Sequence, residues 1–180
     1  MSLAVGLSLR ARSNLGLLLY MDASALAKRY VPETGSNLVD EVLDNVSGRR
    51  NCLLNVAAGE VVSILVRRKN AGVISAERLV QLLVDFDSEI AHCRAVRKMA
   101  VTNRLAITAF PLIVTHSINS TDAIALKSAL AIADQLRADG DDLVLVASDE
   151  RLLRAAHAER LTTFNPETQG LAVLTALVGP

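Results

Sequence analysis

The chain has 180 residues, of which 51% are hydrophobic and 3% aromatic, and its 19 basic residues balance its 19 acidic ones. This length suits one domain with a substantial core, and so large an apolar fraction excludes a disordered chain. The shortage of aromatic rings disfavours base stacking on single-stranded nucleic acid, and the zero net charge gives no overall attraction to a polyanion. Since 15 of the basic residues are arginines, we expect any phosphate group to be bound locally.

The elements predicted along the chain alternate between strands and helices. Short apolar runs predict strands buried on both faces, and in chain order they cover residues 15–21, 51–55, 90–96 as the candidate third strand, 143–147 and 161–165. Helical spacing of apolar residues is found at 23–31, 35–46, 56–70, 75–87, 97–118, 123–136 and 150–159. Pro111 should kink or break the longest of these helices. This alternation predicts an α/β fold, a three-layer α/β/α sandwich with a mainly parallel central sheet.

The chain start and the cysteines bear on where the protein works. In residues 1–14 the apolar stretch precedes two arginines, which is the reverse of the order in a signal peptide. We interpret these residues as an N-terminal extension, native or introduced with the expression vector. No run approaches the roughly 18 apolar residues of a membrane span. Cys52 and Cys93 lack metal-ligand spacing and fit a reducing compartment, so residues 15–180 are expected to form one cytoplasmic domain without membrane contact.

Four acidic residues stand where a carboxylate is locally unusual: Asp22, Glu60, Asp122 and Asp149. Asp22 and Asp149 end apolar runs, and ligands of open parallel sheets bind at the carboxyl ends of strands. Each is explained about equally well as a helix N-cap. Asp122 opens an apolar helix, where the helix dipole alone favours an acid. Glu60 interrupts an apolar stripe, so it needs either a metal ion or an arginine partner.

Taken together, the four acids predict a site for a hard cation at the carboxyl edge of the sheet. Carboxylates supply the oxygen ligands that Mg²⁺ prefers, and without a cation they would repel one another. One or two ions would activate a water and stabilise phosphodiester displacement. The absence of histidine from these positions disfavours Zn²⁺. Ser24, Thr121 and Ser148 accompany three of the acids and are candidates to orient them, although helix capping explains Thr121 and Ser148 nearly as well.

Other kinds of site find less support in the sequence. There is no phosphate-binding glycine loop and no serine in a nucleophile elbow. A phosphatase acting on a small phosphorylated substrate is an open alternative, although Asp22-Ala-Ser24 lacks the second aspartate of aspartyl-phosphate phosphatases. A receiver-like domain with Asp22 as phosphoacceptor would need its acids and lysine arranged differently. A binding module with a degenerate, non-catalytic site is the third alternative.

Four short motifs resemble, in order, those of PIN domains, and more narrowly the VapC-type toxins of bacterial toxin–antitoxin pairs. They are Leu-Tyr-Met-Asp22-Ala-Ser24 with Pro32-Glu33 after it, the helix at 55–72 with Glu60, Ser120-Thr-Asp122-Ala, and Val-Ala-Ser-Asp149-Glu with Asn165-Pro166 after it. The resemblance spans roughly residues 17–166. Ile124-Ala125 stands where the third motif often carries a histidine, and the stretch 90–118 is longer and more apolar than in the family.

The resemblance implies a function. It implies an endoribonuclease whose acidic Mg²⁺- or Mn²⁺-dependent site hydrolyses RNA phosphodiester bonds, and it assigns Asp22, Glu60, Asp122 and Asp149 to that site. It further implies a cognate antitoxin protein and a homodimer. Nearby arginines or Lys28 would steady the RNA backbone. The hypothesis requires all four acids to meet at the carboxyl edge of a parallel sheet.

Overall fold

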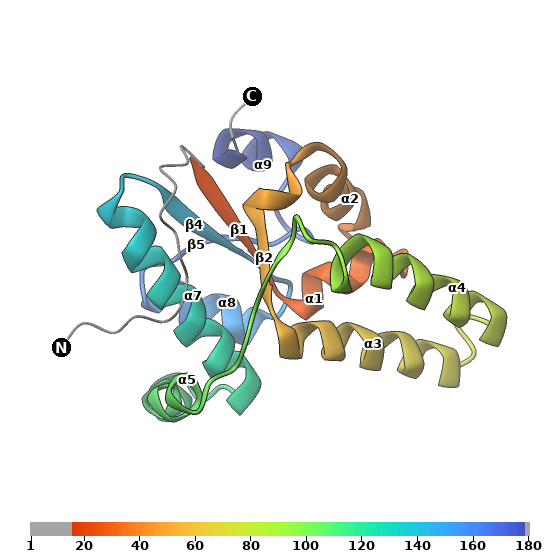
Figure 1. Cartoon of the computed structure of the whole chain (residues 1–180), viewed down its shortest axis with the longest axis horizontal. Coiled ribbons are helices and arrows are strands. Elements are labelled where there is room, and N and C mark those ends of the chain that lie inside the picture. The colour runs from red at the N-terminus through yellow and green to blue at the C-terminus, as the bar shows by residue number, and fades with distance from the viewer. Residues whose placement is uncertain (1–15, 179–180) are drawn as a thin grey trace.

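The computed structural model describes residues 16–178, and within them five strands form one parallel sheet (Figure 1). The strand order is β3-β2-β1-β4-β5, and each neighbouring pair is parallel. The strands are β1 (Leu17–Met21), β2 (Asn51–Leu54), β3 (Arg97–Met99), β4 (Asp142–Val146) and β5 (Thr162–Phe164). The mainly parallel sheet predicted from the sequence is therefore confirmed.

Helices cover both faces of this sheet. The first half contributes α1 (Ala23–Leu26), a 3₁₀ turn (Ala27–Arg29), α2 (Ser36–Asn45), a second 3₁₀ turn (Gly48–Arg50), α3 (Asn55–Asn70) and α4 (Ala76–Phe86). The second half contributes α5 (Asn103–Thr108), α6 (Phe110–His116), α7 (Ser120–Ala138), α8 (Glu150–Ala158) and α9 (Leu171–Val178). In Figure 1, α3 and α4 extend as an arm on one side, and α5 and α7 lie on the other. The three-layer α/β/α arrangement is confirmed as well.

The order in which the chain adds strands to the sheet reverses between β1 and β4. From β1 the chain proceeds outward to β2 and β3, and then returns to β4 on the other side of β1. Right-handed crossovers consequently place α3 and α7 on opposite faces, while α9 at the end of the chain lies beside α2 (Figure 1). The carboxyl ends of two strands that diverge in this way leave a crevice, which is the usual ligand site of an open α/β sheet.

The core consists of aliphatic side chains around β1 and β4. Leu19, Val144 and Leu145 are fully buried in the sheet, and Leu126 and Leu152 cover it from α7 and α8. Both central strands read as nearly continuous apolar runs because helices cover them on both faces. The predicted strands at 15–21, 51–55, 143–147 and 161–165 match β1, β2, β4 and β5 to within a few residues.

The region around residue 95 departs from the prediction. The candidate strand at 90–96 is wrong, because Asp87–Ala91 extends α4 as a wide helical turn and the third strand follows at Arg97–Met99. This edge strand is only half-buried and carries two charged residues, so its apolar pattern is weak. Pro111 stands at the start of α6, where the missing proline N–H costs no hydrogen bond.

Two further predictions concern the ends of the chain and the membrane. Residues 1–14, interpreted as an extension, lie outside the described residues. No helix within residues 16–178 combines the length and the apolar character needed to cross a bilayer.

Candidate functional site

Asp22 and Asp149 stand at the diverging ends of β1 and β4. Asp22 directly follows β1, and its backbone N–H donates to the carbonyl of Val146 at the end of β4, at 2.9 Å. Asp149 comes three residues after that strand, and both acids are N-caps of the following helices, α1 and α8. The capping explanation is therefore correct for both, and it holds them at the crevice that the topology creates.

The Ser24 hydroxyl connects these two strand ends. It donates to Oδ2 of Asp22 at 2.6 Å, and it accepts the backbone N–H groups of Ser148 at 2.9 Å and Asp149 at 3.3 Å. The Ser24 backbone N–H also donates to Asp22 Oδ2, at 2.9 Å. Ser24 thus fixes the Asp22 carboxylate to the loop that carries Asp149. By contrast, the buried Ser148 hydroxyl has no hydrogen-bond partner within residues 16–178.

Glu60 and Asp122 come from the helices on either face of the sheet. Glu60 lies in the second turn of α3 and is half-buried. Asp122 lies in the first turn of α7, where Asn119 caps the helix and its side-chain amide donates to Asp122 Oδ2 at 2.8 Å. The arginine partner considered for Glu60 is not found, because no ion pair within residues 16–178 involves it. The Thr121 hydroxyl lies near Glu60 and lowers its pKa slightly against larger opposing effects.

Burial and mutual repulsion raise the pKa values of three of these carboxyl groups. Burial is the main cause for Asp22, and the charge of Asp149 adds to it against the hydrogen bonds from Ser24. Burial likewise raises the pKa of Glu60, with repulsion from Asp22 and Asp122. Burial raises the pKa of Asp122 to about 6, with repulsion from Asp149 and Asp22. These repulsions connect all four acids, so the four side chains are neighbours in space.

The four carboxylates are neighbours without forming a closed ligand shell. Within residues 16–178, no three carboxylate, imidazole or thiol groups are arranged to hold a metal ion as they stand. Hydrogen bonds turn three of the acids toward their own loops: Asp22 accepts from Ser24, Asp122 from Asn119, and Asp149 from the backbone of α8. The repulsion among the four carboxylates indicates that they share one edge of the sheet. Their oxygens do not converge on a single point in the described residues.

The donor set at this edge fits a hard divalent cation. All four groups offer carboxylate oxygen, which Mg²⁺ and Mn²⁺ prefer, and none is a histidine or a thiolate. The pKa values of Asp22, Glu60 and Asp122 are raised by burial first and by repulsion from neighbouring carboxylates second. A divalent cation between the carboxylates would remove that repulsion.

The cations nearest the acids are arginines. The charge of Arg67 lowers the pKa of Glu60, and the charge of Arg151 lowers that of Asp122, each against larger raising effects. Both arginines are exposed. Of the cations named as alternatives for contacting RNA, Lys28 is already engaged: its side chain is 2% exposed, and its ammonium group is bound to Glu33 at 2.8 Å and Glu167 at 2.6 Å.

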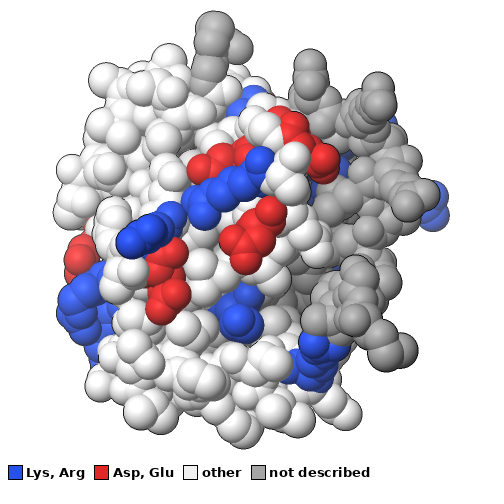
Figure 2. All heavy atoms as spheres, turned by 90° about the vertical axis from the view of Figure 1, so that its left-hand side faces the viewer, with Lys and Arg blue, Asp and Glu red and all other residues white. Residues whose placement is uncertain are grey.

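Charge on the face that contains α5 and α7 is mixed. The face in Figure 2, which lies on the α5 and α7 side, carries basic and acidic side chains interspersed, without a continuous basic area. This agrees with the zero net charge. The described residues of this face therefore offer no broad basic area to a polyanion.

Two polar residues beside this edge were not predicted as site residues. Asn165 follows β5, and its side-chain amide donates to Glu150 Oε1 at 2.9 Å. The sequence contains the signal that would have found Asn165, because it is a polar residue at the carboxyl end of a predicted strand. Glu150 lacked such a signal, since an acid in the first turn of a helix is common.

The parallel sheet, its helical layers and the acids at its carboxyl edge define the PIN-like class of α/β/α fold. FitAB bound to an IR36 DNA fragment matches with a TM-score of 0.62 and 14% identity, over 85% of this chain and 98% of that one. PAE2754 from Pyrobaculum aerophilum matches with a TM-score of 0.57 and 18% identity, over 89% and 97%. Mycobacterium tuberculosis VapC20, a sarcin-ricin loop cleaving toxin, matches with a TM-score of 0.54 and 18% identity, over 76% and 94%.

Sequence comparison narrows this class to a family, although no family model matches the chain. Two proteins of Mycobacterium tuberculosis, Ribonuclease VapC45 of strain CDC 1551 / Oshkosh and Ribonuclease VapC49 of strain ATCC 25618 / H37Rv, are each 30% identical to it over 141 residues. Each alignment covers 78% of this chain and 90% of the relative. The chain belongs to the VapC ribonuclease family.

Proposed function

We propose that this chain is an endoribonuclease that hydrolyses RNA phosphodiester bonds, with Mg²⁺ or Mn²⁺ held by Asp22, Glu60, Asp122 and Asp149. Membership of the VapC family supports the ribonuclease activity. The observation that supports a metal is the shared edge at which four carboxylates repel one another with no ion pair among the described residues. A toxin role is supported by VapC20, which is described as a toxin.

In this mechanism the protein supplies placement and charge. When bound, one or two divalent ions would provide the Lewis acidity that lowers the pKa of an attacking water and offsets charge on the phosphate. Ser24 fixes the orientation of the Asp22 carboxylate and connects it to the Asp149 loop. Asn119 holds the Asp122 carboxylate in the same manner. Such preorganisation limits the rearrangement that must accompany each turnover.

Substrate contacts would come from the two arginines beside the acids. Arg67 projects from α3 and Arg151 from α8, so they approach the crevice from the two helical layers. Each guanidinium group can bind phosphate oxygens in a bidentate fashion. They would hold the RNA backbone on either side of the bond that is cleaved.

The proposed partners are a cognate antitoxin protein and a second copy of the chain. Exposed apolar side chains on α5 and α6 support a protein contact: Ile107, Phe110 and Val114 are each more than half exposed. A cytoplasmic location is also proposed. The free thiols of Cys52 and Cys93 support it, because unpaired cysteines are typical of reducing compartments.

The test of this function is RNA cleavage by Asp22→Asn beside Asp40→Asn. Asparagine keeps the size of Asp22 and its acceptor oxygen, but removes the charge that a cation requires. We expect a loss of about a thousandfold in cleavage rate, which corresponds to ~4 kcal/mol of transition-state stabilisation. Asp40 lies on α2 and pairs with Arg29, so its variant should cleave normally. Full activity of Asp22→Asn with Mg²⁺, at unchanged thermal stability, would contradict the mechanism.

A further inference from the structure

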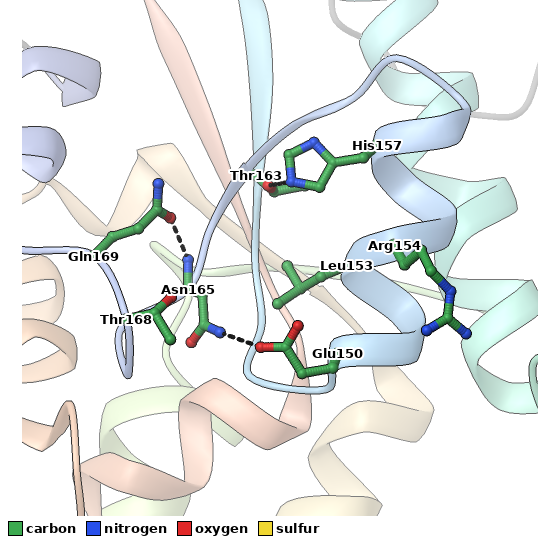
Figure 3. A pocket seen from close by; sticks show the side chains of 8 residues that line it. All are labelled: Glu150, Leu153, Arg154, His157, Thr163, Asn165, Thr168 and Gln169. Atoms are coloured by element: carbon green, nitrogen blue, oxygen red, sulfur yellow. Dashed lines mark hydrogen bonds between the residues drawn. The ribbon is translucent and has the colours of Figure 1, made fainter.

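A cavity of about 520 Å³ lies between α8 and the segment that follows β5 (Figure 3). One wall is a single face of α8, formed by Glu150, Leu153, Arg154 and His157 at helical spacing. Thr163, Asn165 and Gln169 form the opposite wall. The volume falls within the range of about 300–1,000 Å³ that is typical of small-ligand sites.

The wall after β5 is held rigidly by hydrogen bonds. Asn165 is 5% exposed, and its backbone and side-chain polar groups are all engaged in hydrogen bonds. Its side-chain amide donates to Glu150 at 2.9 Å, its backbone N–H donates to Gln169 Oε1 at 2.7 Å, and its Oδ1 accepts from the Glu167 N–H at 2.9 Å. The ion pair between Lys28 and Glu167 anchors the same segment to the first half of the chain. The cavity is therefore a built feature rather than a loose surface hollow.

The cavity begins beside the carboxylates at the sheet edge. Glu150 directly follows Asp149 in the chain, and Asn165 follows β5, the strand that pairs with β4. The backbone N–H of Ala147 donates to the carbonyl of Phe164 at 3.1 Å, which keeps these two strand ends together. A polymer whose phosphodiester bond lies at the acids would consequently place a neighbouring unit at this cavity.

The chemistry of the lining matches one ribonucleotide. We propose that this cavity binds a ribonucleotide next to the cleaved bond, with Glu150 accepting hydrogen bonds from ribose hydroxyls and Arg154 contacting a phosphate. Carboxylates commonly bind ribose hydroxyls in nucleotide sites, and the 2′-hydroxyl distinguishes RNA from DNA. This proposal rests on the proposed ribonuclease function and assigns it a subsite.

Arg154 and the other lining residues complete this subsite. The exposed Arg154 forms no ion pair with any group in residues 16–178. Its side chain lies at the rim and points away from Asn165 in Figure 3, so it is available to a phosphate at the mouth. On the same face of α8, His157 Nε2 and the Thr163 hydroxyl form a hydrogen bond at 2.9 Å. These groups and the Gln169 amide offer donors and acceptors to a base.

The first experiment measures steady-state RNA cleavage by two cavity variants. Arg154→Ala should raise KM about tenfold with kcat unchanged, which is the loss expected for one charge-assisted hydrogen bond. Glu150→Gln keeps the acceptor oxygen for Asn165, and should reduce the preference for RNA over the same sequence in DNA. Arg78→Ala, at the start of α4 on the arm opposite α5 and α7, is the matched control and should leave KM unchanged. Unaltered KM and RNA preference in both cavity variants would overturn the proposal.

The second experiment separates this proposal from the ribonuclease function. The unchanged chain, without metal, is titrated with the four ribonucleoside 5′-monophosphates and their deoxy counterparts, and the NMR signals of His157 and Gln169 are followed. We expect the ribonucleotides to shift these signals more than the deoxynucleotides do. If the chain cleaves no RNA, the ribonuclease function is wrong, but this titration still shows whether the cavity binds a ribonucleotide. NMR signals that do not shift would overturn the proposal. It would also be overturned if Arg154→Ala or Glu150→Gln weakened inhibition by a protein partner and left RNA cleavage unchanged.

Discussion

Two groups of carboxylates in this molecule differ in what neutralises them. On the surface, Arg29 forms ion pairs with Asp40 at 3.1 Å, Asp44 at 2.9 Å and Glu89 at 3.3 Å. At the sheet edge, Asp22, Glu60, Asp122 and Asp149 form no ion pair with any residue that the structure describes. The first group contains its cation, whereas the second would take one from solution.

The pKa directions express the same difference. Although burial alone would lower the pKa of Arg29, its hydrogen bonds to Glu89, Asp44 and Asp40 raise it, so the surface cluster holds its charge firmly. Burial and repulsion instead raise the pKa of Asp122 to about 6. A cluster that the fold has balanced stabilises the structure, and one that it has left unbalanced is suited to binding.

Removing the cation of the surface cluster should cost stability without changing chemistry. Arg29→Met leaves three carboxylates facing one another, and we expect a loss of about 2 kcal/mol in unfolding free energy, between the values for exposed and buried ion pairs. Urea denaturation measures this loss. Arg78→Met, which alters an exposed arginine on α4, is the control. An Arg29→Met protein that kept its stability but lost RNA cleavage would contradict the purely structural role given to the surface cluster.

The acids at the sheet edge should make the metal-free protein less stable as pH rises. The folded state raises the pKa of Asp122 from 3.8 to about 6, so its contribution to stability is complete below 3.8 and is lost as pH rises through about 6. The raised pKa values of Asp22 and Glu60 act in the same direction.

The measurement is Tm in EDTA at several pH values, with Asp122→Asn as the reference. Between about pH 4 and pH 7, the unchanged chain should lose about 3 °C relative to this variant. Parallel Tm profiles for the two proteins would mean that Asp122 carries no uncompensated charge.

Ser24→Ala tests the connection between the strand ends and should have the smallest effect. It removes the 2.6 Å hydrogen bond to Asp22 and the acceptor for the Ser148 N–H. We expect kcat to fall about tenfold and stability by about 1 kcal/mol, and Ser24→Thr should restore both. Ser63→Ala, which removes a hydroxyl bonded within its own helix, is the control. A Ser24→Ala protein with unchanged kcat would mean that Ser24 contributes to the structure and not to cleavage.

The sequence predicted the elements whose patterns are strong. β1 and β4 are apolar because helices cover both faces, and the helices predicted at 75–87 and 123–136 are found, capped by Ser75 and Asn119. The third strand was predicted at 90–96 instead of Arg97–Met99 because a half-buried edge strand carries little apolar signal. Such a strand is located by its pairing with β2, which is a tertiary property.

The candidate site was partly predictable for similar reasons. Strand ends in a parallel sheet indicated the edge shared by Asp22 and Asp149, while the metal-binding roles of the four acids stay predictions. The ion pair that occupies Lys28 was not visible in the sequence, because its partner Glu167 is distant along the chain. Asn165 had a signal, its place after a predicted strand, whereas Glu150 had none, and only the structure shows that the two are in contact.

The most direct test of the account is calorimetric titration of the metal-free chain with Mn²⁺, beside Asp22→Asn and Asp40→Asn. The account predicts saturable binding by the unchanged chain and by Asp40→Asn, with release of protons near pH 6 because the raised pKa of Asp122 must fall when a cation binds. It predicts that Asp22→Asn binds much more weakly. Equal binding by all three proteins would contradict the account because the metal would then bind without Asp22. No binding by the unchanged chain would also contradict it, and would favour a binding module without a metal site.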